Sequence, residues 1–285
     1  MSDPLQQVIA LLGLEKIDEN LYRGQSEATD WGRVYGGQVI AQALSAAAQQ
    51  VDPERHIHSF HSYFLRPGNP DYPIIFEVES NLDAGTISNR RVKAVQRGQT
   101  IFFMTSSFQL NIDSFDHQSE MPDVPPPENL PKEMELSAEA IRLTPEEWLP
   151  KFNAVRAIDF RAVGHDDPSM PSNHKRMWMK PNGPLPNNPC VHNYLLAYAS
   201  DFCFLSTASH PHNVSFMTED MRMATIDHSM WYHRPFDFND WLLYDMDSPS
   251  ASNGRGFVRG KIYDRAGRLV ASSTQEGIMR KKRSS

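Results

Sequence analysis

The sequence predicts an α+β fold built from two copies of one unit, in which a buried helix is followed by short antiparallel strands. Residues 38–48 and 193–205 are rich in small and apolar side chains and predict the two helices. Each helix precedes several strand-like stretches that are separated by turns. Motifs also recur between the two parts of the chain, which indicates a duplicated unit whose sheet curves around its own helix.

The first copy opens with two small elements and continues with the alanine-rich helix. Gly36 and Gly37 directly precede that helix. Glycine allows a sharp turn there, and the free amides of a helix N-terminus favour negative charge; a plain tight turn into a buried helix is equally compatible with the pair. The expected elements are a helix at 4–13, a strand at 17–22, and strands at 58–65, 74–80, 88–97 and 100–110, with a hairpin turn at Gly98-Gln99.

The character of the chain changes after residue 110. Residues 116–150 contain many prolines and acidic side chains, which predicts a surface linker between a first unit at 1–115 and a second unit at 151–285. A short helix is expected inside this linker at 137–143. The second unit is expected to open with strands at 158–163 and 175–180.

Two strand motifs support the duplication. Residues 60–67 resemble residues 227–235 when the pair His61-Ser62 is matched with His228-Ser229, and residues 106–109 resemble residues 272–275 in nearly the same register. The two helices, at 38 and 193, begin closer together in sequence than these strand motifs do, so the second copy needs a longer loop after its helix. A self-match over this length predicts that the two units pair side by side, join their sheets and bury both helices.

The second helix carries one acidic residue among apolar neighbours. Asp201 lies in the second half of the predicted helix, one turn after Ala197 and Tyr198. A helix that is apolar almost all round is expected to be buried, so this carboxylate must be paired, hydrogen-bonded or neutralised. It is either a structural aspartate or a catalytic base, and burial alone favours neither role.

The positions at which the two copies differ point to a site in the second copy. Asp201, Thr225 and Gln275 supply a carboxylate, a hydroxyl and a carboxamide there. Together these groups can hold one water, whose proton the carboxylate accepts. Thr225 or Gln275 alone would suit an ordinary strand, and only the combination with a buried aspartate predicts catalysis. Their counterparts in the first copy are, in the same order, about Ser45, then His58, then Gln109 or Phe108.

Composition argues against several classes of protein. The net charge of −7 and the pI of about 5.9 argue against nucleic-acid binding. No apolar stretch of about 20 residues predicts a membrane span, and no secretory signal is expected at the N-terminus. The two cysteines, Cys190 and Cys203, form no CxxC motif, which indicates a reducing compartment rather than a disulfide framework.

Several other motifs fail on their spacing. His56, His58 and His61 suggest a metal site, but a strand places the third on the opposite face, so no metal is expected. His58 could still line the site. No G-x-S-x-G elbow or Walker loop is present, and the glycines at 254, 256 and 260 miss the dinucleotide-binding spacing. No cofactor is therefore expected.

Three segments resemble the acyl-CoA thioesterase II family of the TesB type. They are HSFHSYFLRPG at 58–68, TIDHSMWYHRP at 225–235 and RGFVRG at 255–260, and the resemblance extends from about residue 14 to residue 277. It implies a double hot-dog fold and hydrolysis of fatty acyl-CoA to free fatty acid and CoA. It also places the family's catalytic residues on Asp201, Thr225 and Gln275. The missing peroxisomal tripeptide implies a cytoplasmic, bacterial-type setting.

The resemblance leaves several alternatives open. The activated water could attack the thioester carbonyl, with the oxyanion met by backbone amides or Gln275, or Asp201 could attack directly through an anhydride. The same fold could instead host an enoyl-CoA hydratase-like enzyme or a non-catalytic acyl-CoA-binding module. The CoA phosphates would suit Arg90, Arg91 and Lys93. We expect a homodimer or homotetramer of the double unit.

Overall fold

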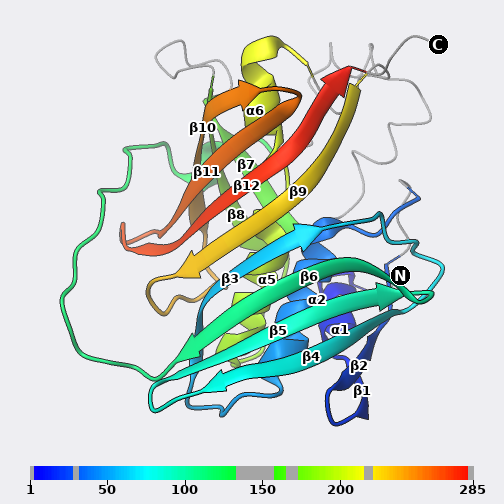
Figure 1. The fold of residues 1–285 in the computed structure, drawn as a ribbon. Coiled ribbons are helices and arrows are strands. Elements are labelled where there is room, and N and C mark those ends of the chain that lie inside the picture. Colours follow the sequence, from blue (N-terminus) through cyan, green and yellow to red (C-terminus); the bar gives the residue numbers. More distant parts are fainter. Residues whose placement is uncertain (1–2, 28–31, 133–156, 165–172, 215–220, 282–285) are drawn as a thin grey trace.

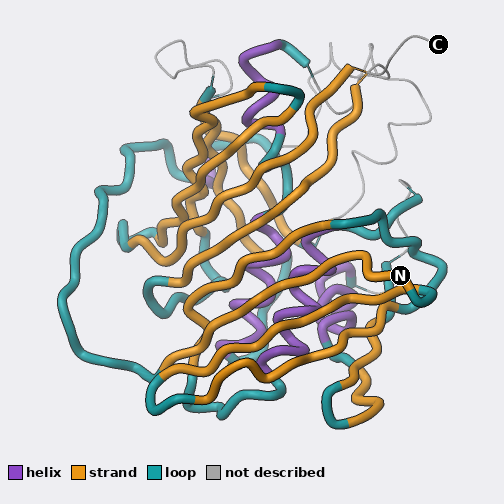
Figure 2. Tube along the Cα trace, viewed as in Figure 1, coloured by secondary structure: helices purple, strands orange, loops and turns teal. Residues whose placement is uncertain are grey.

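A computed structural model describes residues 3–27, 32–132, 157–164, 173–214 and 221–281. Its central feature is a twelve-stranded antiparallel sheet that curves around two helices (Figures 1 and 2). Helix α2 (Gly36–Ala48) and helix α5 (Pro189–Ser200) contact each other on the same side of the sheet. This arrangement confirms the predicted α+β class, with both helices buried by one joined sheet.

The strands follow one another in an order that repeats from the two edges towards the centre. The order is β1-β2-β4-β5-β6-β3-β9-β12-β11-β10-β8-β7, and the antiparallel neighbours β3 and β9 join the two halves. Each half therefore contributes six strands in the same relative order, as a duplicated unit requires. The strands are β1 (Glu15–Asp18), β2 (Leu21–Gly24), β3 (His56–Phe64), β4 (Ile74–Asp83), β5 (Ile87–Gln96), β6 (Gln99–Gln109), β7 (Ile158–Val163), β8 (His174–Pro181), β9 (Met221–Tyr232), β10 (Leu242–Ser252), β11 (Arg255–Asp264) and β12 (Leu269–Lys281).

Three predicted elements differ from the structure. The strand expected at 17–22 is a hairpin, because the polar residues Glu19 and Asn20 form a turn between β1 and β2. The helix expected to reach residue 205 ends at Ser200, and Cys203 adopts a left-handed conformation with φ of 56°. The turn between β5 and β6 is centred on residues 97–98, both with positive φ. The helix predicted at 137–143 lies outside the described residues.

Backbone hydrogen bonds fix which residues of the two halves correspond. The amides of residues 65 and 66 both donate to the carbonyl of residue 101, and those of residues 233 and 234 both donate to that of residue 270. Residue 65 therefore corresponds to residue 233, which pairs His228 with Phe60 and not with His61. A shift of one residue reverses the face of every side chain in a strand, so the predicted histidine-serine match is wrong. His228 and Phe60 are both fully buried, whereas His61 is exposed.

A single apolar core runs through both halves. Helix α2 buries almost every side chain, and its alanines let it lie close against α5 and the sheet. Phe60 on β3 and Met230 on β9 are completely buried where the two halves meet. The short helix α1 (Pro4–Leu12) buries Leu5 and Val8 against this core and ends at Gly13, as predicted. Helices α2 and α5 therefore pack in one core to which both halves of the chain contribute side chains.

The proline-rich segment lies along the outer face of the second half. A second apolar cluster, centred on Trp178, Trp241 and Leu243, packs against Met121 and Val124 of this segment. The Trp178 indole donates to a carbonyl at residue 125, 3.0 Å away. The segment contains the 3-10 helix η1 (Pro127–Asn129), and the helix α6 (Ser206–Ser209) and 3-10 helix η3 (His210–His212) follow α5. No helix within the described residues has the length and apolar character needed to span a bilayer.

Candidate active site

The three residues singled out in the second copy meet where α5 ends. Asp201 is the C-cap residue of α5, Thr225 lies on β9, and Gln275 lies on the neighbouring strand β12. The Thr225 hydroxyl donates to Asp201 Oδ1 at 3.4 Å, and Gln275 Nε2 donates to Thr225 Oγ1 at 3.0 Å. The carboxylate, hydroxyl and carboxamide therefore form one connected group.

The first half contributes the start of helix α2 to this group. The backbone amide of Gly37 donates a hydrogen bond to the Asp201 carboxylate. A Cβ atom on Gly36 would lie 2.6 Å from Asp201 Oδ2, and one on Gly37 would lie 2.2 Å from the Tyr198 carbonyl oxygen. Only glycine permits this close approach of the two backbones. One of the free amides predicted at this helix N-terminus, that of Gly37, thus contacts a carboxylate.

The surroundings of Asp201 change its acidity. Burial raises the pKa of its carboxyl group from 3.8 to about 6, while the hydrogen bonds from Gly37 and Thr225 act in the opposite direction. The side chain sits at the C-terminal end of α5, where the helix dipole also disfavours negative charge. A carboxylate of this pKa is ionised at neutral pH and is a much better proton acceptor than an ordinary aspartate.

Two further polar residues extend the group inward. His228 Nδ1 lies 2.7 Å from Gln275 Oε1, and His228 Nε2 lies 3.0 Å from Ser200 Oγ. His228, Gln275 and Ser200 are all buried, and burial lowers the pKa of the His228 imidazole to about 4, so this ring is neutral at pH 7. The motif comparison included His228 without giving it a role. A bulge at Ile226 lets the side chains of residues 225 and 228 both contact the side-chain amide of Gln275. Simple strand alternation would place these two side chains on opposite faces of the sheet.

The described residues of the first half contain no equivalent group. The observed correspondence pairs Gln275 with Ser106, and matching bulges at His58 and Ile226 pair Thr225 with Ile57. By their place as C-caps, Asp201 corresponds to Gln49. The counterparts predicted from sequence were therefore wrong by one to four positions. The conclusion that only the second copy carries the three polar groups still holds. The predicted counterparts that the structure replaces are Ser45, His58, Gln109 and Phe108.

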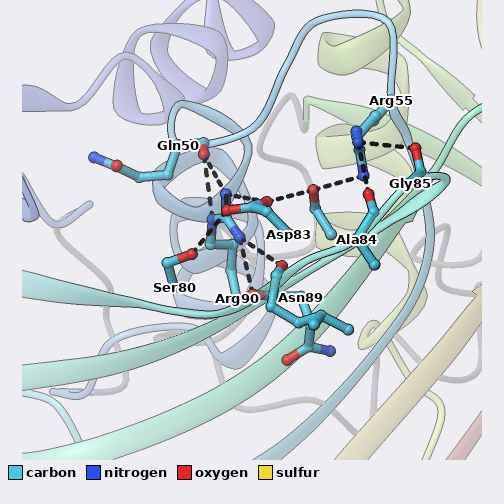
Figure 3. Close-up of polar contacts among 10 residues, drawn as sticks. Gln50, Arg55, Ser80, Asp83, Ala84, Gly85, Asn89 and Arg90 are labelled. Carbon is cyan, nitrogen blue, oxygen red and sulfur yellow. Dashed lines mark hydrogen bonds and ion pairs between the residues drawn. The ribbon is translucent and has the colours of Figure 1, made fainter.

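The end of α2 is closed by an arginine. Arg90 is 4% exposed, and its Nε and Nη2 atoms donate to the Gln50 carbonyl at 3.2 and 2.7 Å, just beyond the helix (Figure 3). Its guanidinium also pairs with Asp83 at 2.8 Å. Arg90 was expected on the surface as a ligand of the CoA phosphates. That expectation is wrong, because the guanidinium points inward and is bound by the protein's own oxygens.

The remaining polar candidates lie elsewhere on the sheet. Arg91 is exposed, with its guanidinium 5.9 Å from the centre of the Phe103 ring, and Lys93 forms an ion pair with Glu77. His58 Nε2 lies 2.8 Å from Ser107 Oγ, and burial lowers the pKa of its imidazole. Within the described ranges, no three His, Cys, Asp or Glu side chains are grouped as metal ligands would be.

Comparison with known proteins identifies the family. Residues 26–109 match the acyl-CoA thioesterase N-terminal domain, and residues 165–278 match the acyl-CoA thioesterase family. The chain is 42% identical to acyl-CoA thioesterase 2 of Haemophilus influenzae, over 98% of this chain and 99% of that protein. It is 37% identical to human acyl-coenzyme A thioesterase 8, over 96% and 89% of the two chains.

Solved structures agree with this result. Acyl-CoA thioesterase II TesB2 from Mycobacterium marinum has a TM-score of 0.81 and 36% identity, covering 98% of this chain and 99% of its own. A hot dog fold protein from Alicyclobacillus acidocaldarius has a TM-score of 0.77 at 20% identity, which bears on the fold alone. The two joined helix-and-sheet units are therefore a double hot-dog, and the chain belongs to the acyl-CoA thioesterase II family of thioester hydrolases.

Proposed function

We propose that the protein hydrolyses fatty acyl-CoA to a fatty acid and CoA, using a water activated by Asp201, Thr225 and Gln275. The observation that carries this proposal is the connected group itself, in which a carboxylate of raised pKa contacts the hydroxyl that the carboxamide orients. A general base works best when its pKa lies near the working pH. Asp201 meets this condition, whereas an ordinary surface aspartate does not.

The reaction follows from the chemistry of a thioester. Asp201 accepts a proton from the water while the water oxygen bonds to the carbonyl carbon of the thioester. The carbonyl oxygen then becomes the oxyanion of a tetrahedral intermediate. The carbon–sulfur bond then breaks, the carboxylic acid is released, and Asp201 returns the proton to the CoA thiolate. Gln275 Nε2 donates one of its two N–H groups to Thr225. Its second N–H, together with backbone amides, is therefore available to hydrogen-bond the oxyanion.

We also extend the proposal to the setting of the enzyme. The acyl chain would lie in apolar surroundings between a helix and the sheet. The chain would divide into units at 1–115 and 151–285 joined by the linker at 116–150, and would act as a cytoplasmic homodimer or homotetramer. Sedimentation analysis of the full-length chain measures the assembly, and a monomer at micromolar concentration would contradict that part of the proposal.

Release of free thiol from decanoyl-CoA and palmitoyl-CoA tests the reaction directly. We expect continuous thiol release, and no loss of the enoyl absorbance when crotonyl-CoA is supplied. Hydration of crotonyl-CoA without thiol release would instead indicate a hydratase. Such an enzyme usually pairs an aspartate with a histidine, whereas His228 contacts Gln275 and the Asp201 side chain contacts Thr225 and Gly37. Binding of acyl-CoA without either reaction would indicate a binding module.

A single turnover in ¹⁸O-labelled water distinguishes the two chemical routes. Activation of water by Asp201 places the label in the fatty acid alone. Attack by Asp201 itself would form an anhydride, and hydrolysis of that anhydride at its aspartyl carbonyl would leave label in the aspartate carboxyl group. Mass spectrometry of the peptide that contains residue 201 measures this outcome, and label in that peptide would overturn the proposed role of the water.

A further inference from the structure

The polar group at the end of α5 has a defined direction of hydrogen bonding. An ionised carboxylate can only accept, so the Thr225 hydroxyl donates to Asp201. The same hydroxyl oxygen then accepts from Gln275, which turns the amide nitrogen of Gln275 towards Thr225 and its carbonyl oxygen towards His228. Because that carbonyl oxygen can only accept, the proton of the neutral imidazole must be on Nδ1.

Ser200 is placed to support this tautomer of the ring. With its proton on Nδ1, His228 presents Nε2 as an acceptor, and the Ser200 hydroxyl lies 3.0 Å away. The same hydroxyl is also 2.9 Å from the Ala197 carbonyl oxygen, which a serine in a helix commonly bonds. The Ser200 proton can satisfy only one of these two acceptors. Because Nδ1 carries the proton in this series of hydrogen bonds, only donation from Ser200 to Nε2 makes the second contact of the ring a hydrogen bond.

We propose that His228 is a positioning residue for thioester hydrolysis, held by Ser200 as the Nδ1–H tautomer so that Gln275 and Thr225 both donate towards Asp201. The inference rests on the proposed catalytic role of those three residues. His228 does not reach Asp201 by any described hydrogen bond and touches the site only through the Gln275 carbonyl. Its ring is fully buried, so bulk water does not take over this task.

The same contacts define what happens when the Nδ1 donor is lost. The Gln275 carbonyl would have no partner in a buried site, so no contact would keep the amide nitrogen turned towards Thr225, and the amide could turn over so that its oxygen and nitrogen exchange places. The turned amide would present its oxygen to Thr225, whose hydroxyl would then donate to Gln275 instead of Asp201. Asp201 would lose one of the two hydrogen bonds that stabilise its charge, and it would need a higher pH to ionise.

Two substitutions of similar size test this consequence. His228→Asn keeps an N–H near the position of Nδ1, whereas His228→Leu fills the same space without a donor. We expect His228→Leu to lower kcat by about 10- to 100-fold and to move the acid limb of the kcat/KM profile to higher pH, with KM changed less. His228→Asn should keep kcat within about threefold of wild type and leave the limb in place.

Two serines provide the matched comparison. Ser200→Ala removes the donor to the imidazole ring, and Ser62→Ala removes a donor to the backbone carbonyl of the same histidine, 2.7 Å away. Both serines are buried, so both substitutions should lower the melting temperature. Only Ser200→Ala should move the acid limb. If the acid limb of the kcat/KM profile lies at the same pH in His228→Leu, His228→Asn and wild type, His228 is only a structural residue and the proposal is overturned.

A measurement without turnover separates this inference from the proposed function. Nitrogen-15 correlation spectra of histidine-labelled protein distinguish the two neutral tautomers, and we expect His228 as the Nδ1–H form at pH 7. A protein that hydrolyses acyl-CoA with its proton on Nε2 contradicts only the role of His228. A protein with the expected tautomer but no thiol release contradicts the proposed function instead.

Discussion

The backbone amide of Gly37, the second residue of helix α2, donates a hydrogen bond to the carboxylate of Asp201, the C-cap residue of helix α5. The first half of the chain thus stabilises an acidic group that belongs to the second half. The N-terminus of one helix offsets the unfavourable charge at the C-terminus of the other. Among the described residues, this hydrogen-bonded group therefore draws on both halves of the chain.

Replacement of Gly37 by alanine tests this contact. The added methyl group would lie 2.2 Å from the Tyr198 carbonyl oxygen and 2.6 Å from the Tyr35 ring, so α2 must move away from α5. We expect a loss of about 1–3 kcal/mol in the free energy of unfolding and a lower kcat. Gly85→Ala is the control, because no atom lies within 4 Å of its added Cβ. Equal stability of the two variants, measured by urea denaturation, would refute the contact.

Asp201→Asn should separate activity from stability. We expect kcat for acyl-CoA to fall by about 10²- to 10⁴-fold, because the proposed general base is lost. The pKa of the Asp201 carboxyl group rises from 3.8 to about 6 on folding. The protonated group therefore favours the folded state below pH 4, and this contribution is lost as the pH rises through 6. The variant should be more stable than wild type at pH 8, by up to about 3 kcal/mol.

Urea denaturation at pH 4 and pH 8 measures the stability difference. At pH 4 wild type and variant should differ much less than at pH 8, because Asp201 is then largely protonated in the folded chain and about half protonated in the unfolded chain. A variant that is less stable than wild type at pH 8 would show that the ionised carboxylate stabilises the fold and is not strained by burial.

The pH dependence of wild-type hydrolysis gives a separate measurement. In the proposed mechanism Asp201 reacts as the carboxylate, and the pKa of this group is about 6. We expect kcat/KM to fall tenfold for each pH unit below about 6 and to level off above it. Thiol release must be followed with a reagent whose response does not change with pH. A limb near pH 4 would show that the base is a less buried carboxylate.

Thr225 offers a matched pair of substitutions. Thr225→Ser keeps the hydroxyl that links Gln275 to Asp201, and Thr225→Val keeps the shape without the hydroxyl. We expect Thr225→Val to lower kcat about 10- to 100-fold and Thr225→Ser to lose less than about tenfold. Should both variants lose activity equally, the β-branched shape rather than the hydroxyl would be what the site requires.

Arg90 should matter for stability but not for chemistry. It lies at the far end of α2 from Gly37, roughly 20 Å along the helix axis. Arg90→Met leaves the Gln50 carbonyl without its donors, and we expect a loss of about 2–4 kcal/mol with little change in kcat. Arg91→Met, on the exposed face of the same strand, should change stability by less than about 0.5 kcal/mol. A large loss of kcat in correctly folded Arg90→Met would contradict this assignment.

Patterns that repeat within one element could be read from the sequence. The strand at 158–163 and the helix bounded by Gly13 match the structure, because alternation and a terminal glycine are local signals. The duplication was also visible. The pairing of the copies was one residue out in the first strand motif and three residues out in the second, because a strand match of a few letters tolerates a slip that burial does not.

The site was predictable in its chemistry but not in its connections. Asp201 was recognised as a carboxylate among apolar residues, yet its place beyond the last turn of α5 depends on a loop that turns at Cys203. His228 was named in the strand motif but given no role, because the bulge at Ile226 changes which side chains share a face of the sheet. The burial of Arg90 depends on contacts with Gln50 and Asp83, which no local pattern reveals.

The buried guanidinium of Arg90 bears on how many acyl groups one polypeptide would process at a time under the proposed function. Two identical units would offer two equivalent pockets, one at the end of each long helix. Here the end of α2 is filled by the Arg90 guanidinium, which is buried and donates to the Gln50 carbonyl, so a substrate there would leave that carbonyl without its donor. The stoichiometry at saturation should therefore be a single thioester per polypeptide, and a dimer of such chains would process two.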